Sequence, residues 1–199
     1  MQPGIGFSIG NKATNPFPNC KKEIQEMSMD EEHFVVYESS IGYIIIVTKN
    51  GKVISLDVRS GGMYEAKKIV SSLYPEATES ITPFKAIRTL LDRYLQGRAV
   101  DFEIEVDISH LGVFTQKVLN ELRKIPFGET RSYGWLAKKI GKAGAARAVG
   151  QALKRNPIPI IIPCHRVIRD DGTIGGFSMG VNIKERLLAL EGVHLARAK

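Results

Sequence analysis

The pattern of the sequence changes once, near residue 107, and this change constrains the fold more than any other feature. Upstream of it, apolar runs typical of half-buried strands predict strands at His33–Ser39, Gly42–Lys49 and Val53–Val58. Asn50-Gly51, between the last two runs, is a strong β-hairpin signal. Downstream, helical patterns separated by glycine and proline predominate. A chain of 199 residues can bury one good core or two small ones, and the change of pattern favours two units.

The upstream region also contains two helical patterns and a last strand. The helices are predicted at Met63–Leu73 and Pro83–Leu95, the second with Thr82 as its N-cap. Asp101–Val106 alternates apolar and acidic residues, which predicts a strand with one buried face. We therefore expect a small antiparallel sheet packed with helices over 31–107, a scaffold in which nothing indicates chemistry.

The first thirty residues differ from the rest of the chain. They are polar and rich in Gly, Pro and Asn, without a sustained period, so residues 1–30 are predicted to form a loose arm that exposes the thiol of Cys20. They lack the basic-then-apolar order of a signal peptide, and no apolar stretch in the chain is long enough to span a membrane. With only two cysteines in the chain, we expect a cytoplasmic protein with free thiols.

The downstream region, 108–199, predicts a mainly helical unit. Helical patterns occupy Thr115–Lys124, Tyr133–Ile140 and Ala145–Lys154, and Ser132 is placed to cap the second. The last two are short and flank a glycine-bearing turn, which is typical of a helix-turn-helix. The fold class is therefore predicted to be α+β: a small N-terminal antiparallel sheet with helices, then a mainly helical, winged-helix-like C-terminal domain.

Charge separates the two regions as sharply as the pattern does. Residues 1–110 hold 12 Lys and Arg against 15 Asp and Glu, a net charge of −3, whereas residues 111–199 hold 16 against 6, a net charge of +10. Seven of the basic residues and no acidic residue fall within Arg131–Arg155, the helix-turn-helix segment. A basic surface can simply be solvated, but its coincidence with this motif favours a nucleic acid as partner.

Pro163-Cys164-His165-Arg166-Val167 places a thiol beside an imidazole. The proline-punctuated apolar run at 157–162 predicts a stiff extended segment that holds the thiol still. A thiolate suits attack on carbon and needs either a lowered pKa or a neighbouring base such as His165. Neighbouring strand residues point to opposite faces, so the pair can cooperate only if the chain kinks there or a water bridges them. Taken alone, the pair also fits a buried structural cysteine beside a surface histidine.

Together with Asn156-Pro157-Ile158-Pro159 and the helical stretch Ala145–Gly150, this motif resembles the O6-alkylguanine-DNA alkyltransferase family, also called methylated-DNA–protein-cysteine methyltransferases. The resemblance runs almost continuously from Phe114 to Gly192, and the first half matches only in general layout. It implies direct DNA repair, in which the alkyl group, mainly methyl, moves irreversibly from O6 of guanine to Cys164, once per molecule.

The resemblance also assigns roles at the reaction centre. Cys164 is the nucleophile and His165 the base, in a Cys–water–His–Glu relay that Glu191 completes. Tyr133 donates toward a ring nitrogen of the leaving base, and the backbone N–H of Ser178 lies near the base oxygen.

Further residues belong to the base pocket by the same resemblance. Main-chain carbonyls of Cys164 and Val167 accept from the exocyclic amine of guanine, and the glycine-rich loop 172–180 lets the backbone approach a flat ligand. The family often has tyrosine where this chain has Phe177, which keeps the apolar wall and loses a hydroxyl. The other residues implied at the pocket are Ile174, Gly175 and Lys184.

A base inside a duplex must be flipped out to reach such a cysteine. Arg147 resembles the arginine of the family that fills the resulting gap, and the small residues Ala146 and Gly150 let the helix enter a minor groove. Asn156 is expected to act as a hinge that ties this helix to the active-site segment. The candidate phosphate contacts are Lys138, Lys139, Lys142, Lys154 and Arg155.

The expected partner is double-stranded DNA carrying O6-alkylguanine, bound by a monomer without an obligate protein partner. No cofactor is expected, and Cys20, His33 and His110 are too few for a convincing metal site in the first half. One alternative stays open: a helix-turn-helix protein that binds alkylated DNA without chemistry and flags it for other repair. Cys164 argues against it, since binding alone needs no nucleophile. A cysteine hydrolase fits the basic helices less well.

Overall fold

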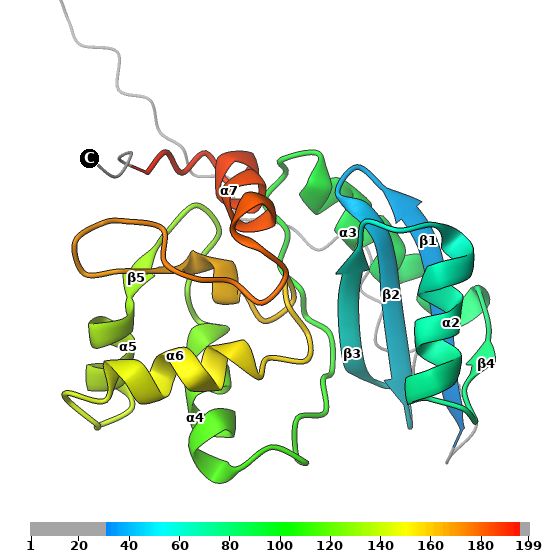
Figure 1. Ribbon diagram of the computed structural model, residues 1–199, viewed down its shortest axis with the longest axis horizontal. Helices are drawn as coiled ribbons and strands as arrows, with labels where there is room; N and C mark the ends of the chain where they lie inside the picture. Colours follow the sequence, from blue (N-terminus) through cyan, green and yellow to red (C-terminus); the bar gives the residue numbers. More distant parts are fainter. Residues whose placement is uncertain (1–30, 196–199) are drawn as a thin grey trace, which may run out of the picture.

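The computed structural model describes residues 31–195, and the predicted arm over 1–30, with Cys20, lies outside the described residues. The described chain forms two halves that lie side by side, a sheet with its helices and a mainly helical half (Figure 1). Among the described helices, none is both long and apolar enough to cross a bilayer.

The predicted strands and hairpin are confirmed. β1 (Glu32–Ser39), β2 (Gly42–Lys49) and β3 (Lys52–Arg59) pair antiparallel in chain order. Asn50 and Gly51 connect β2 to β3 with φ angles of 51° and 68°. Two positive φ angles in a two-residue loop match a type I′ turn, whose twist suits the strands on either side.

A short fourth strand and two helices complete this half. β4 (Thr78–Glu79) pairs parallel with β1, so the sheet order is β3-β2-β1-β4. α2 (Met63–Leu73) covers one face of the sheet and α3 (Lys85–Leu95) the other (Figure 1). Alternate apolar side chains serve the two faces: Phe34, Val36, Ile45 and Val47 pack in the cluster with α2, and Val35, Tyr37, Ile44 and Ile46 in the cluster with α3.

Two local predictions for this half are wrong. Thr82 does not cap α3, because Thr82–Phe84 forms a 3₁₀ turn and the cap position falls on Phe84, without a side-chain bond. Asp101–Val106 forms no regular strand, since only Val53 pairs with it, donating to Glu105 O at 3.0 Å and accepting from Asp107 N at 2.9 Å. The alternation there correctly marked burial, but burial of one face does not require a hydrogen-bonded ladder.

The helix-turn-helix is present in the second half. α5 (Tyr133–Lys139) is followed by α6 (Ala146–Lys154), both within one residue of the predicted bounds. Ser132 caps α5 as predicted, accepting a hydrogen bond from Trp135 N at 3.1 Å. α4 (Val113–Leu122), which begins two residues earlier than predicted, packs against α5 and α6.

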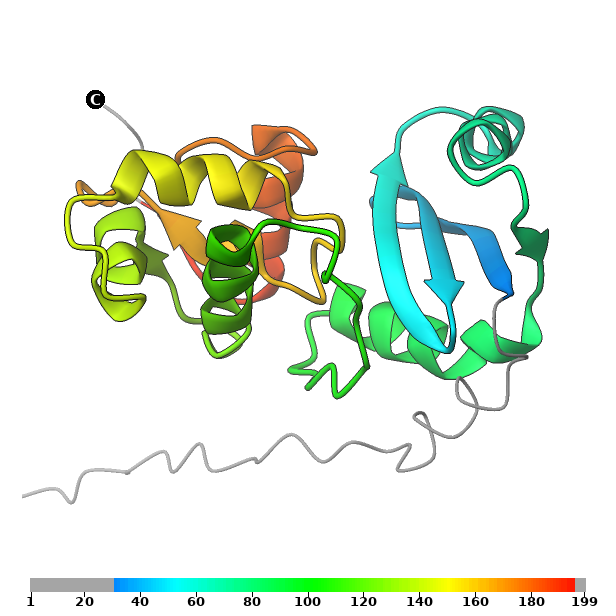
Figure 2. The same cartoon turned by 90° about the horizontal axis from the view of Figure 1, so that it is seen from below.

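Two short strands and a last helix surround the helix-turn-helix. β5 (Arg131–Ser132) and β6 (Val167–Ile168) form a two-stranded parallel sheet. A glycine-rich loop then leads to α7 (Val181–Leu190), which ends beside the C-terminal end of α3 (Figures 1 and 2).

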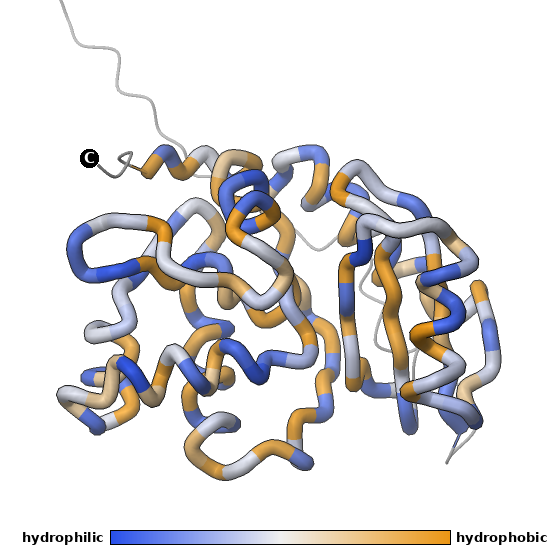
Figure 3. Tube along the Cα trace, in the orientation of Figure 1, coloured by the Kyte–Doolittle hydropathy of each residue, from blue (hydrophilic) through white to orange (hydrophobic). Residues whose placement is uncertain are grey.

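One apolar core is shared by the two halves. A single cluster of buried residues joins Leu56, Leu91 and Phe102 to Leu119 and Ile162. The outer edge of β3 faces the second half, and Leu56 N–H donates to Pro157 O at 2.8 Å. Hydrophobic segments accordingly run through the middle of the molecule as well as along the sheet (Figure 3). The segment that carries the cysteine motif is therefore anchored on both sides.

Candidate active site

The chain reaches Cys164 from α6 through a tight turn, and not through the predicted extended segment. Ile162 N–H donates to Ile158 O at 2.9 Å, and Ile160 has a φ of 73°. Cys164–Arg166 then form a 3₁₀ turn. Side chains in such a turn do not alternate as they do in a strand, so the kink that Cys164 and His165 need exists.

Asn156 stabilises this turn with both ends of its amide. Its Nδ2 donates to Ile162 O at 2.8 Å and to Cys164 Sγ at 3.1 Å, while its Oδ1 accepts from Ile158 N at 3.1 Å. Asn156 is itself buried. It therefore joins the end of α6 to the sulfur atom, which is the position predicted for a hinge.

Cys164 is only 4% exposed and lines a cavity of about 350 Å³. Burial raises the pKa of its thiol to about 11, although the bond from Asn156 and the charge of Lys184 act in the opposite direction. The thiol is therefore neutral near neutral pH. Of the two routes to a thiolate considered above, a lowered pKa is not what this environment provides, which leaves a neighbouring base.

His165 is fully buried and has two partners on one ring nitrogen. Its Nε2 lies 2.7 Å from Glu191 Oε1 and 3.1 Å from the hydroxyl of Tyr94. Burial lowers the pKa of His165, and the hydrogen bond and charge of Glu191 act against that shift. A carboxylate beside Nε2 favours the tautomer with hydrogen there. Nδ1, which has no hydrogen-bond partner among the described residues, is then the basic nitrogen.

Glu191 follows α7 and is the centre of a buried network. Its carboxylate accepts from Gly128 N at 3.0 Å and from Arg166, whose nitrogens lie 2.9–3.1 Å from its two oxygens. Burial raises the pKa of Glu191, but the hydrogen bonds from His165 and Arg166 outweigh it and bring the pKa to about 2. Glu191 is therefore ionised, as a partner that orients a base needs to be.

Two members of this network were not predicted from the sequence. Arg166 follows the Cys-His pair directly, is 6% exposed, and also donates to Ile125 O at 2.7 Å. Tyr94, on α3 in the other half, donates its hydroxyl to Glu191 Oε1 at 2.7 Å. The helical pattern marks Tyr94 as buried, but no local signal shows that its hydroxyl reaches a residue 97 positions away.

The cavity beside Cys164 is lined by two of the six residues predicted for the base pocket, Phe177 and Ser178, and by the predicted proton donor Tyr133. The other four, Val167, Ile174, Gly175 and Lys184, are not among its lining residues. The full lining is Tyr133, Gly150, Leu153, Lys154, Cys164, Gly176, Phe177 and Ser178. The cavity therefore lies between α6, the cysteine turn and the glycine-rich loop, with a phenol, a hydroxyl and a thiol at its wall.

Gly175 acts through Tyr133. It has a φ of 68°, and a Cβ atom there would stand 3.0 Å from the Tyr133 hydroxyl oxygen. Gly150 approaches the same ring from α6, where a Cβ atom would stand 3.7 Å from Tyr133 Cε1. The two glycines thus leave room for the phenol to lie at the cavity wall.

Lys184 lies behind the cavity and is fully buried. Its Nζ donates to Val167 O and, at 3.3 Å, to Gly176 O. Burial lowers the pKa of Lys184 to about 8, with Cys164 acting against the shift and Arg169 adding to it. The Val167 carbonyl accepts from Lys184 with one of its two lone pairs, which leaves the other for the predicted contact with the guanine amine.

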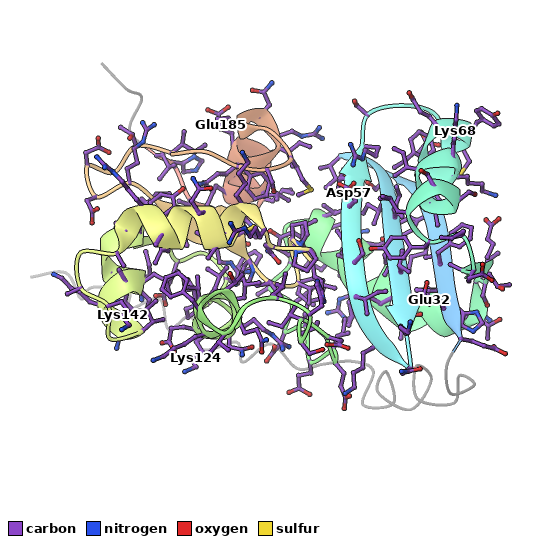
Figure 4. All side chains as sticks on the ribbon, turned by 60° about the horizontal axis from the view of Figure 1, so that its bottom comes forward. Glu32, Asp57, Lys68, Lys124, Lys142 and Glu185 are labelled. Carbon is purple, nitrogen blue, oxygen red and sulfur yellow. The ribbon has the colours of Figure 1, made fainter. Side chains whose placement is uncertain are left out.

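The predicted DNA-contact residues lie along α6, in the last turn of α5 and in the turn that joins the two helices. Arg147, Lys154 and Arg155 are exposed along α6, with Ala146 and Gly150 partly buried between them and the cavity. Lys138 is exposed in the last turn of α5, and Lys142 projects from the turn between the two helices, at the outer end of the motif (Figure 4). The structure thus places a basic surface along the helix that also forms one wall of the cavity.

Comparison with known proteins matches both halves of the chain. A family model described as 6-O-methylguanine DNA methyltransferase, ribonuclease-like domain, matches residues 33–108, and one described as 6-O-methylguanine DNA methyltransferase, DNA binding domain, matches residues 113–193. A Methanosarcina acetivorans protein named methylated-DNA–protein-cysteine methyltransferase is 38% identical over 161 residues, 80% of this chain and 98% of that protein. A Mycobacterium leprae protein of the same name is 52% identical over 101 residues, 51% of this chain and 61% of that protein.

Solved structures show the same similarity in three dimensions. The crystal structure of Mycobacterium tuberculosis OGT in complex with DNA has a TM-score of 0.70 and 36% sequence identity, covering 80% of this chain and 92% of that chain. The structure of an O6-methylguanine DNA methyltransferase from Methanococcus jannaschii has a TM-score of 0.57 and 30% identity, covering 83% of this chain and 97% of that chain.

Proposed function

Because this chain belongs to the 6-O-methylguanine DNA methyltransferase family, we propose that it repairs DNA by transferring the methyl group of O6-methylguanine to Cys164. The observation that carries the proposal is the placement of Cys164 Sγ at a cavity wall, beside a buried histidine that a carboxylate orients. A binding protein would have no use for that combination of nucleophile and oriented base.

Proton transfer precedes or accompanies the attack. The neutral thiol gives its proton, through a bridging water, to Nδ1 of His165, and Glu191 stabilises the imidazolium that forms. The thiolate then attacks the methyl carbon, forming the S–C bond as the C–O6 bond breaks. The electron pair stays on guanine, which takes a proton at a ring nitrogen from the Tyr133 hydroxyl, and Tyr133 recovers it from solvent or the relay. The net products are S-methylcysteine and guanine.

Each protein molecule transfers one methyl group only. A thioether has no facile hydrolytic exit, and among the described residues Cys164 is the only cysteine, so no second thiol stands beside it to accept the methyl group. The chain supplies the nucleophile, the base and the proton donor itself: Cys164 and Tyr133 line the cavity, and His165 is buried next to Cys164 in the chain. We therefore propose a monomer that works without a cofactor.

DNA is bound through the basic side of α6. Arg147 occupies the duplex in place of the flipped nucleotide, Ala146 and Gly150 allow the helix close to the minor groove, and Lys138, Lys154 and Arg155 contact phosphates. Lys154 also lines the cavity, so the backbone contact and the base pocket are adjacent. The flipped guanine can then enter between Tyr133 and Phe177.

Incubation with duplex DNA carrying O6-methylguanine is expected to add one methyl group to one peptide. Mass spectrometry of a digest is expected to show the gain on the peptide containing Cys164, in a one-to-one ratio with guanine formed in the DNA. The peptide containing Cys20 serves as an internal control and stays unmodified. Tight binding of lesion DNA without a mass change would instead identify a binding protein, and repeated turnover would identify a hydrolase.

Arg147→Ala is expected to slow transfer from duplex DNA by about 10- to 100-fold, since flipping costs roughly a few kcal/mol and Arg147 offsets part of it. Transfer from a single-stranded oligonucleotide, where no stacked pair must be opened, is expected to change much less. Arg98→Ala removes an exposed arginine from the other half and is the matched control. Equal losses on the duplex and on the single strand would show that Arg147 contributes only its positive charge to DNA binding and has no role in base flipping.

A further inference from the structure

Tyr94 connects the first half of the chain to the reaction centre. It lies in the last turn of α3 and is fully buried. Its hydroxyl is 2.7 Å from Glu191 Oε1 and 3.1 Å from His165 Nε2. The half that the sequence predicted to be a scaffold therefore places one hydroxyl against both the proposed base, His165, and the carboxylate that orients it, Glu191.

The Tyr94 ring is fixed by aromatic neighbours. Phe102 packs against it at a centroid distance of 5.8 Å, and Phe127 at 6.0 Å with the rings nearly perpendicular. The residues that follow α3 also pack closely against the end of α7. Gly97 has a φ of 77°, and a Cβ atom there would stand 3.3 Å from Leu190 O. The hydroxyl is thus held at one place by packing from both halves.

The hydroxyl of Tyr94 acts as a donor to one of its two partners and as an acceptor for the other. A phenol has one proton to donate, and it goes to Glu191 Oε1. The phenol oxygen can then accept only from His165 Nε2–H, never donate to that nitrogen. A donor to Glu191 and an acceptor for His165 both favour the same arrangement, in which Nε2 carries hydrogen and Nδ1 stays free to take the thiol proton.

We propose that Tyr94 is a positioning residue of the transfer reaction, whose hydroxyl holds Glu191 ionised and His165 in the tautomer that presents a basic Nδ1 toward the thiol. This inference rests on the proposed methyl transfer to Cys164. It assigns to the first half a part in the chemistry, in addition to its packing role.

Other charged groups also shift the pKa of His165. Glu191 after α7 favours the imidazolium, while Arg166 from the cysteine turn and Lys184 from α7 disfavour it. Tyr94 shares Glu191 Oε1 with the histidine, so its donated bond weakens the pull of that oxygen on the His165 proton. Removing the hydroxyl leaves Oε1 a stronger base toward His165, and more of the histidine is then protonated, and inactive as a base, at a given pH.

Tyr94→Phe tests the proposal, because it removes the hydroxyl and keeps the ring packed between Phe102 and Phe127. The rate of methyl transfer is expected to fall about tenfold at pH values on the acidic limb of the pH–rate profile, and less at neutral pH. The acidic limb of the pH–rate profile is expected to move to higher pH by about one unit, because it reports the protonation of His165. A titration of ¹⁵N-labelled histidine by NMR follows the same shift without requiring any transfer.

Tyr37→Phe is the matched control. Tyr37 is also a buried tyrosine of the first half, and its hydroxyl has no hydrogen-bond partner among the described residues. Its removal is expected to leave both the rate and the pH profile as they are. The binding of lesion DNA, measured with Cys164→Ser in each background, is expected to be equal for both variants.

The outcomes separate this inference from the proposed function. Failure of the unaltered protein to methylate Cys164 would reject the function itself. A protein that transfers normally, combined with a Tyr94→Phe variant whose pH profile and histidine titration match those of the unaltered protein, would overturn only the role of Tyr94. A uniform loss of rate at all pH values, with an unshifted titration, would also overturn it, since that is the signature of a structural defect.

Discussion

Cys164→Ser is expected to abolish methyl transfer, with a loss on the order of 10³-fold or more, as when other enzymes lose their nucleophile. Burial already raises the pKa of the thiol to about 11, and a hydroxyl at the same buried site is harder still to ionise. His165 can assist proton removal, but it cannot make oxygen as soft a nucleophile as sulfur toward carbon. Single-turnover assays with O6-methylguanine in a duplex measure the loss.

The same variant is expected to keep its affinity for lesion DNA. The basic side of α6 and the cavity wall around Tyr133 are unchanged, and serine is close to cysteine in size. Cys20→Ser, which alters the other cysteine of the chain, is the control and is expected to transfer at the normal rate. Undiminished repair by Cys164→Ser would reject the mechanism.

Glu191→Gln is expected to lower both the transfer rate, by about a hundredfold, and the free energy of unfolding, by about 3 kcal/mol. The rate falls because a neutral amide no longer stabilises the His165 imidazolium. Stability falls because Arg166, whose side chain is 7% exposed, is left as a buried charge without its counter-charge. Urea unfolding at neutral pH measures the second effect. Glu121→Gln removes an exposed pair with Lys124 and is expected to cost well under about 1 kcal/mol.

The pH dependence of the free energy of unfolding provides a second test of the role of Glu191. The folded-state pKa of Glu191, about 2, lies below its ordinary value of 4.5. Its contribution to stability is therefore complete above the ordinary pKa and is lost as the pH falls from there through about 2, by roughly 3 kcal/mol in all. The Glu191→Gln variant lacks this titration, so its stability is expected to depend less on pH in that window. Identical pH dependence of the two proteins would contradict the role given to the carboxylate.

The sequence predicted those features that depend on local patterns. The three long strands follow from apolar runs and from Asn50-Gly51, and the helix-turn-helix follows from caps and a glycine turn. β4 was missed because two exposed polar residues carry no pattern. The alternation of Asp101–Val106 was correct for burial and wrong for pairing, since a partner strand cannot be read from one segment.

The reaction centre was predictable only where residues are close in sequence or belong to a motif. Cys164, His165 and Asn156 are of this kind, and the resemblance added Glu191. Tyr94 and Arg166 were missed because their importance comes from tertiary contacts, one across 97 positions and one through burial of a residue type that is usually solvated. The thiol's raised pKa was likewise invisible, because it depends on how deeply the fold buries the sulfur.

The contact between β3 and the second half has a consequence for solubility. Leu56 donates to Pro157 of the second half, and Val53 pairs with residues 105–107 of the first half, so three backbone groups on the outer edge of β3 are bonded within the chain. An unpaired strand edge is a template on which further molecules add, strand by strand, into aggregates. The segment that leads to the cysteine covers part of this edge at Leu56, and this part of the protection lasts for as long as the two halves stay together.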